Sequence, residues 1–188
     1  MGALKDCEAV VHAILGQPVN TLTALAFVVG GIVIARRSKS RWVGIAAIVT
    51  GFGSFLFHGP MPPLAEWAHD ATLAWLLLVV AGYGRPWESW TRLPGLAAVA
   101  VLAAIPGWGD PLGVVLAGAA VANVLLADRS WSTLGPVLIL AIAAGIGRLG
   151  ATGGPWCDPA SPWQPHGLWH VAAAAALSWW ALAASVSR

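Results

Sequence analysis

The chain has 188 residues, of which 58% are hydrophobic and 10% are charged, and its mean hydropathy is +0.74. A soluble domain carries about 25% charged residues, so this composition excludes an ordinary water-soluble protein and indicates an integral membrane protein. The length allows one domain over residues 1–188, and the net charge of +2 without a basic aromatic patch argues against a nucleic-acid partner.

Seven apolar runs, separated by Pro, Gly and charged residues, predict an all-α integral membrane fold, a seven-transmembrane helix bundle. The runs cover residues 19–35, 42–58, 64–82, 93–105, 112–127, 134–149 and 167–186. The fourth and fifth are short and flank the turn-like stretch IPGWGDPLG. The sequence leaves open that these two form a re-entrant pair, which would keep the number of crossings odd.

The basic residues predict the orientation, because cytoplasmic loops are enriched in Lys and Arg. Placing the loop RRSKSR in the cytoplasm puts eight of the ten Lys and Arg on that side, and only Lys5 and Arg148 lie toward the other. The N-terminus, with an exoplasmic segment over residues 1–17, is then outside and the C-terminus is inside. Richness in Ala, Gly, Arg and Trp and the short loops favour a GC-rich bacterium, and hence a multi-pass protein of its inner membrane.

The two cysteines fall on the same predicted side. Cys7 precedes the first run and Cys157 precedes the last, so both lie outside. A disulfide persists in an oxidising compartment such as the periplasm, although two free thiols satisfy the topology equally well.

Ionisable side chains inside apolar runs are costly and tend to mark function. With the predicted orientation, His58 ends the second run at its outer end, Asp70 lies a turn or two into the third, and His166 and His170 open the seventh. Three histidines and one carboxylate from three helices therefore share one depth near the exoplasmic, periplasmic side.

The spacing of these residues is typical of metal chemistry. His166 and His170 are four residues apart and face the same side of a helix, and Ser54 stands one turn before His58. Three imidazoles and a water form the open site of a catalytic zinc. Asp70 would take the proton of a zinc-activated water, and Ser54 would donate to the developing oxyanion.

Simpler interpretations of the same residues stay open at this point. A histidine pair at this spacing arises by chance at a membrane interface, and a serine in a membrane helix often bonds to its own backbone. Asp70 would equally pair with His69 or Arg148.

Five short motifs carry a resemblance to a known family. They are CE at residues 7–8, QPVNT at 17–21, GFGSFLFH at 51–58, HD at 69–70, and CDPASPWQPHGLWH at 157–170. In this order, and spread over almost the whole chain, they resemble the alkaline ceramidases and their bacterial relatives. These belong to the CREST superfamily of seven-helix membrane hydrolases, which includes the adiponectin receptors.

The resemblance implies a role for each matching position. His58, His166 and His170 match the zinc ligands of the family, Asp70 matches the acid that holds and deprotonates the water, and Ser54 matches the oxyanion-stabilising serine. Cys7 and Cys157 look like the family's disulfide pair. Four further polar residues are expected to lie around the site: Glu8, Asn20, Glu66 and His69.

One motif departs from the family. Ceramidases with a calcium site carry a dense acidic stretch around and after CE, whereas here Glu8 is followed by Ala, Val and Val, and Gln17 stands where an acid is wanted. We therefore expect Zn²⁺ as cofactor and no tight calcium site, and the substrate need not be ceramide itself.

The sequence thus predicts a zinc-dependent intramembrane lipid amide hydrolase that cleaves the N-acyl bond of a sphingolipid or related N-acyl lipid and releases a fatty acid. Two alternatives are a zinc-stabilised, non-catalytic lipid-binding or receptor-like membrane protein, and a lipid esterase. A transporter is disfavoured because the polar set lies toward one face and no repeat is visible.

Overall fold

The computed structural model describes residues 5–11 and 14–186, and these residues form helices and loops without strands. The helices are α1 Pro18–Arg37, α2 Arg41–His58, α3 Ala65–Gly82, α4 Leu93–Ala103, α5 Gly109–Ala127, α6 Trp131–Leu149 and α7 Pro165–Val186, with a short 3₁₀ turn, η2, at Glu88–Thr91. Each predicted run coincides with one helix to within three residues. The predicted segment 1–17 is described only at residues 5–11 and 14–17.

The helix starts follow from local chemistry. α1 and α7 each begin at a proline, whose fixed φ suits the first turn and whose missing N–H would have no partner there. α1 has no side-chain cap from its own N-cap residue. Instead, the Glu8 carboxylate accepts from the backbone N–H groups of Val19 and Asn20, at 2.7 and 2.8 Å. A carboxylate at this end of a helix is favourable for the helix dipole.

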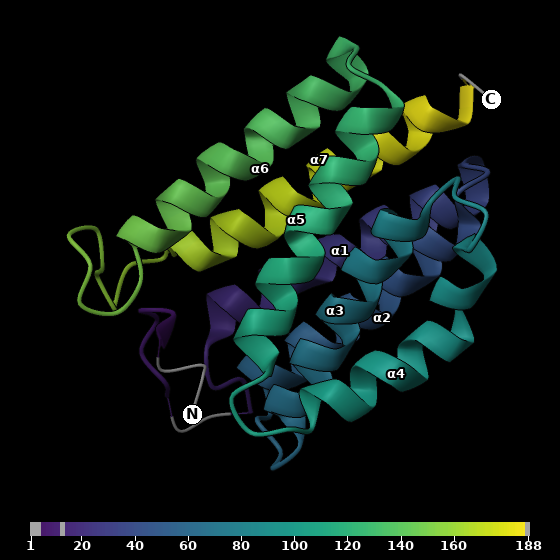
Figure 1. The fold of residues 1–188 in the computed structure, drawn as a ribbon. Coiled ribbons are helices and arrows are strands. Elements are labelled where there is room, and N and C mark those ends of the chain that lie inside the picture. The colour runs from purple at the N-terminus through teal and green to yellow at the C-terminus, as the bar shows by residue number, and fades with distance from the viewer. Residues whose placement is uncertain (1–4, 12–13, 187–188) are drawn as a thin grey trace.

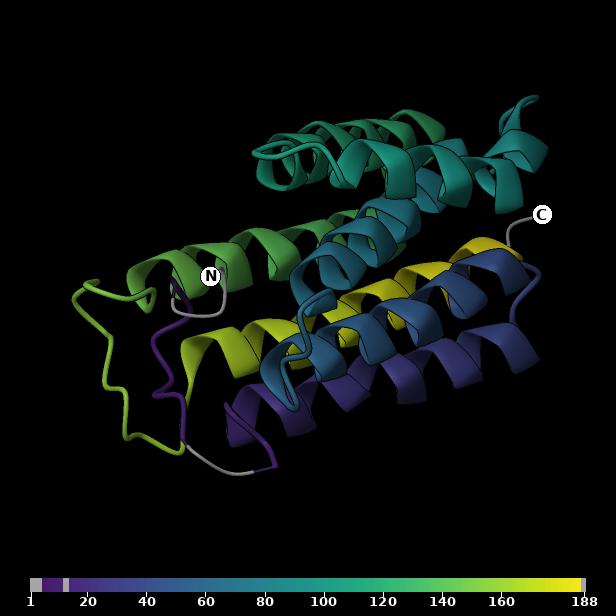
Figure 2. The same ribbon diagram turned by 90° about the horizontal axis from the view of Figure 1, so that it is seen from below.

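The helices pack in a chain of neighbours: α6 lies against α7, α7 against α1, α1 against α2 and α2 against α3, while α4 and α5 both pack on α3. Figures 1 and 2 show α1, α2 and α7 side by side, with α3 between them and the α4–α5 pair. Gly31 and Gly44 allow α1 and α2 to approach closely, since a Cβ on Gly31 would lie 2.6 Å from the Gly44 carbonyl oxygen.

Five helices in the described part of the chain are long and apolar enough to cross a membrane: α1, α2, α5, α6 and α7. α4 is apolar but has only 11 residues. α3 has 18 residues, and Glu66, His69 and Asp70 lie in its first two turns. The large apolar side chains exposed on α5 and α6, such as Val114, Leu126 and Ile142, suit a lipid environment. The chain is therefore a helical membrane protein.

One end of the bundle collects the basic loops. Ser38, after α1, donates to the Ala181 carbonyl near the end of α7 at 2.9 Å. Arg92 lies over the ring of Trp42 at the start of α2, at 5.7 Å from the centroid. Asn123 of α5 donates to the Val80 carbonyl at the end of α3, and its amide oxygen accepts from Arg85. Of the basic residues predicted on this side, Arg188 lies outside the described residues.

The N-terminal segment lies at the opposite end of the bundle from the C-terminal end of α7 (Figures 1 and 2). There, Cys7 and Cys157 form a disulfide, as the family resemblance implied. The Lys5 carbonyl also accepts from the Thr152 N–H at 2.9 Å. Opposite ends for the two termini are what an odd number of passes requires.

The turn between α4 and α5 lies against the first two turns of α3. The Trp67 indole N–H donates to the Ala100 carbonyl at 2.9 Å, and Gly109 abuts the Asp70 side chain. α4 and α5 are thus separate helices, and their connection lies against the start of α3.

Candidate metal centre

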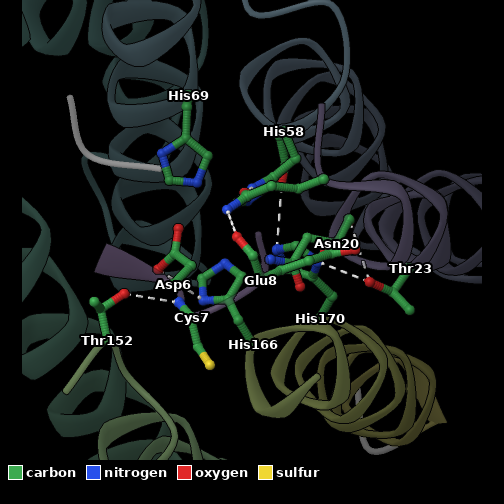
Figure 3. Close-up of polar contacts among 12 residues, drawn as sticks. Asp6, Cys7, Glu8, Asn20, Thr23, His58, His69, Thr152, His166 and His170 are labelled. Atoms are coloured by element: carbon green, nitrogen blue, oxygen red, sulfur yellow. Dashed lines mark hydrogen bonds and ion pairs between the residues drawn. The ribbon is translucent and has the colours of Figure 1, made fainter. Parts of the chain in front are cut away.

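The three predicted ligands meet in one group. His58 is the last residue of α2, and His166 and His170 lie in the first turns of α7. One ligand atom from each lies within 4.8 Å of the others, and the ring centroids are 4.6 to 5.3 Å apart. Figure 3 shows the three rings turned toward one another. Two helices, α2 and α7, therefore supply the histidines, as the sequence predicted, and α1 packs against both of them.

An oxygen atom lies next to the Nδ1 atom of each ring. His58 Nδ1 is 2.6 Å from Gln17 Oε1, His170 Nδ1 is 3.1 Å from Thr23 Oγ1, and His166 Nδ1 is 3.3 Å from Asp6 Oδ1. The other ring nitrogen, Nε2, is buried without a hydrogen-bond partner among the described residues in both His58 and His166. Buried polar atoms are rarely left in this state.

This arrangement fits a metal ion. Neutral imidazole is a common zinc ligand, and two nitrogens bound at 2.0–2.1 Å to a tetrahedral zinc are about 3.4 Å apart. The ligand atoms of the group lie within 4.8 Å of one another, so a closing of the side chains by at most about 1.5 Å brings three nitrogens onto one tetrahedral ion. Three protein ligands leave a fourth position open, as in catalytic zinc sites.

Ser54 lies directly beside the group. Its side chain is buried on α2, one turn before His58, and its Oγ is 3.2 Å from His170 Nε2. The hydroxyl is therefore next to the nitrogen that a metal would occupy. The sequence left open that this hydroxyl donates to a backbone carbonyl of its own helix. In the structure it contacts His170 instead.

Asp70 and His69 lie to one side of the three histidines. The His69 Nδ1 atom is 3.0 Å from Asp70 Oδ1, and the His69 ring stacks on Phe57 with centroids 4.7 Å apart. The ring centroid of His69 is 6.2 Å from that of His58. Asp70 is not part of the metal group. Pairing of Asp70 with His69 was one of the interpretations left open by the sequence.

A cavity of about 580 Å³ opens beside the group, and His166 forms part of its wall. Its polar lining includes His69 and the carboxylates of Asp6, Glu66, Asp70 and Asp110. Lys5 is also in the lining, and it forms an exposed ion pair with Asp110. The histidine group thus adjoins a space that is rich in carboxylates and large enough for the polar part of a lipid.

Asp6 is held between this cavity and His166. Burial raises the pKa of the Asp6 carboxyl to about 6, and the neighbouring His69 and Lys5 oppose that effect. A cation bound at the histidines would favour the ionised carboxylate further, because opposite charges nearby stabilise it.

The four other polar residues expected around the site lie in different surroundings. His69 and Glu66 line the cavity, while Glu8 caps α1 and lies two hydrogen bonds away from His58, through Gln17. Asn20 is fully buried, and both polar atoms of its side-chain amide lack a partner among the described residues.

Sequence reasoning missed three residues at the site: Asp6, Gln17 and Thr23. The sequence pattern singled out Gln17 only as the absence of an acid, and it assigned no role to Asp6 or Thr23. Their contacts arise from the way in which the N-terminal segment folds back on the bundle. The one signal was in QPVNTLT, residues 17–23, where two amides and two hydroxyls open an otherwise apolar helix.

A scan against protein-family models and searches of curated proteins and solved structures find no match to this chain.

Proposed function

We propose that the protein is a zinc-dependent membrane hydrolase that cleaves the amide bond of an N-acyl lipid, similar to the alkaline ceramidases. The observation that carries the proposal is the meeting of three imidazoles from α2 and α7, two of them with a buried Nε2 atom that lacks a partner among the described residues. The sequence motifs that surround these histidines support the same chemistry.

His58, His166 and His170 would hold the ion. A zinc ion in this position supplies a Lewis acid and lowers the pKa of a bound water to about 7. Ser54 would donate a hydrogen bond to the carbonyl oxygen of the substrate as negative charge develops on it. The distance of 3.2 Å between its hydroxyl and one ligand nitrogen, His170 Nε2, supports this role.

Proton transfer falls to His69 and Asp70. The Asp70 carboxylate accepts from the Nδ1–H of His69, which leaves the other nitrogen of His69 as an acceptor. The centroid of the His69 ring is 6.2 Å from that of His58. We propose that Asp70 acts together with His69, accepting the proton of the attacking water and passing it to the leaving amine.

The cavity supports an amide over an ester. The product amine becomes protonated near neutral pH, and the carboxylates of Asp6, Glu66, Asp70 and Asp110 in the cavity lining attract a cation. An alcohol released from an ester stays neutral, so these carboxylates would not attract it in this way. The acyl chain would remain in the apolar bundle and leave as a fatty acid.

We propose seven membrane passes with the N-terminus outside, so that the site opens to the periplasmic face of a bacterial inner membrane. The basic loops at one end of the bundle and the disulfide at the other support this orientation, because Lys and Arg favour the cytoplasm and disulfides favour the periplasm.

A non-catalytic, zinc-stabilised receptor or lipid-binding protein is the alternative. A structural zinc site is closed by four protein ligands. Here, only three His, Cys, Asp or Glu side chains among the described residues form the group, and one of them lines a cavity. This arrangement favours catalysis.

The test uses purified full-length protein, metal analysis, and paired N-acyl sphingoid and O-acyl substrates. We expect bound zinc, release of fatty acid from the amide, and little release from the ester. Asp70→Asn should keep zinc and folding but lower turnover by at least about 100-fold, whereas Asp128→Asn, which changes an exposed carboxylate between α5 and α6 that does not line the cavity, should change turnover little. Full amide turnover by Asp70→Asn, or turnover by a zinc-free protein, would show the proposal to be wrong.

A further inference from the structure

The hydrogen bonds at the three histidines fix which nitrogen carries the proton. Gln17 Nε2 donates to the Glu8 carbonyl at 2.8 Å, so its Oε1 faces His58 and can only accept a proton from Nδ1. The Asp6 carboxylate is likewise an acceptor for His166. The hydroxyl of Thr23 donates to the Val19 carbonyl at 2.8 Å, which leaves its oxygen to accept from His170.

All three rings are therefore in the Nδ1–H form, with the lone pair on Nε2. This is the form that a metal requires when Nε2 is the ligand, and the Nε2 atoms of His58 and His166 are the ones left without a partner in the described part of the chain. Partners of this kind orient metal-binding histidines and raise their basicity.

Two of the three acceptors, Asp6 and Gln17, belong to the segment that precedes α1 and not to the helices that carry the ligands. Several bonds hold this segment. Cys7 is joined to Cys157, Glu8 accepts from two backbone N–H groups of α1, and the Ala9 N–H donates to the Pro159 carbonyl at 3.1 Å. Figure 3 shows Asp6 next to His166, with Glu8 close by.

We infer that Asp6 and Gln17 are positioning residues that set the metal affinity of the site without touching the ion, and that the Cys7–Cys157 disulfide holds Asp6 in place for this purpose. The inference rests on the proposed function in that it takes the three histidines as the zinc site. Loss of such a partner typically lowers metal affinity by about 10- to 100-fold.

The experiment measures the dissociation constant for zinc, by competition with a chelator, on full-length protein that has been stripped of metal and reloaded in detergent. Asp6→Leu removes the acceptor and should weaken zinc binding about 10- to 100-fold. Asp6→Asn keeps an acceptor oxygen but loses the negative charge, and it should recover most of the zinc affinity. If Asp6 acted through its charge alone, Asp6→Asn would weaken zinc binding as much as Asp6→Leu does. Asp110→Leu is the control, because it removes an exposed carboxylate of the same cavity that contacts Lys5 and not a histidine.

Gln17→Leu should weaken zinc binding by a similar factor and is a second test of the inference. Gln17 is fully buried, so its substitution can also disturb folding. Asp6 is partly exposed, and its variants are therefore the main test. Reduction of the disulfide in wild type should weaken binding in the same direction, whereas reduction in Asp6→Leu should add little.

Two failures are distinguishable. If Asp6→Leu and Gln17→Leu bind zinc within twofold of wild type while His170→Ala loses it, the positioning roles are wrong and the zinc site stands. If wild-type protein binds no zinc, the proposed function fails, and this inference fails with it.

Discussion

At the scale of single residues, the Asp70 carboxylate is confined between His69 and the start of α5. Its Oδ1 is 3.0 Å from His69 Nδ1, and its Oδ2 faces Gly109 so closely that an added Cβ there would collide with it. A glycine at the start of α5 therefore decides where the Asp70 side chain can lie.

Gly109→Ala should displace Asp70 and lower kcat about 10- to 100-fold, because small misplacements of a reacting group are costly. Zinc content should not change, since the atoms nearest to an added Cβ at Gly109 all belong to Asp70. Gly113→Ala is the matched control, one turn further along α5, where an added Cβ meets nothing within 4 Å. Equal activity of the two variants would contradict the role given to Asp70.

Ser54→Ala removes the hydroxyl beside His170 and should lower kcat about 100- to 1,000-fold, as for loss of an oxyanion donor, with zinc retained. Ser178→Ala serves as control, because that hydroxyl bonds to the Ala174 carbonyl of its own helix. The prediction is checked by steady-state kinetics and metal analysis on both variants. Loss of zinc from Ser54→Ala would instead indicate a supporting role at the metal.

Single residues also show what sequence reasoning can reach. The three histidines were found because helix periodicity and membrane depth are both readable from sequence. Asp6, Gln17 and Thr23 were not assigned, because their contacts depend on how the N-terminal segment returns to the bundle. The nearness of Asp70 to His69 was one of several open pairings, and only the packing of α3 against α5 decides among them.

At the scale of elements, α1 and α2 depend on glycine for their contact. A Cβ on Gly44 would lie 2.5 Å from the Ala35 nitrogen and 2.7 Å from the Gly31 carbonyl oxygen. Neither atom can move without shifting a helix backbone. Since α1 holds α2 beside α7, this contact also sets the distance between His58 and the other two histidines.

Gly44→Ala should therefore destabilise the protein by about 1–3 kcal/mol, the usual cost of overpacking, and should weaken zinc binding as well. Gly118→Ala on α5, where the added Cβ meets nothing within 4 Å, should be neutral or slightly stabilising because alanine favours helix. Unfolding in mixed detergent measures both variants. If Gly44→Ala has the same free energy of unfolding and the same zinc affinity as wild type, the close contact between α1 and α2 does not contribute to stability or to the site.

The helix boundaries were predictable because Pro, Gly and charged residues interrupt the apolar runs sharply. The arrangement of α4 and α5 was not predictable from the sequence. An 11-residue helix followed by a Pro/Gly turn is compatible with a membrane-spanning helix and with a re-entrant loop. The hydrogen bond from the Trp67 indole to the Ala100 carbonyl joins α3 to α4. No sequence pattern predicts this contact.

At the scale of the whole molecule, the sequence predicts an odd number of passes with the C-terminus inside, because the basic loops gather on one side. A fluorescent protein fused after Arg188 should fluoresce in a bacterial host, and a periplasmic phosphatase fused there should be inactive, because the C-terminus is expected inside. An active phosphatase fusion would show that the C-terminus is outside. The predicted orientation would then be wrong, and the histidine group would lie on the cytoplasmic side.

The central claim is that three imidazoles bind one zinc ion. X-ray absorption at the zinc edge of the purified wild-type protein tests it most directly. We predict one zinc per chain, three nitrogen scatterers of imidazole type at about 2.0–2.1 Å and no sulfur, with the signal lost in His170→Ala. A protein that contains no zinc, or one whose zinc spectrum is unchanged by that substitution, would contradict the account.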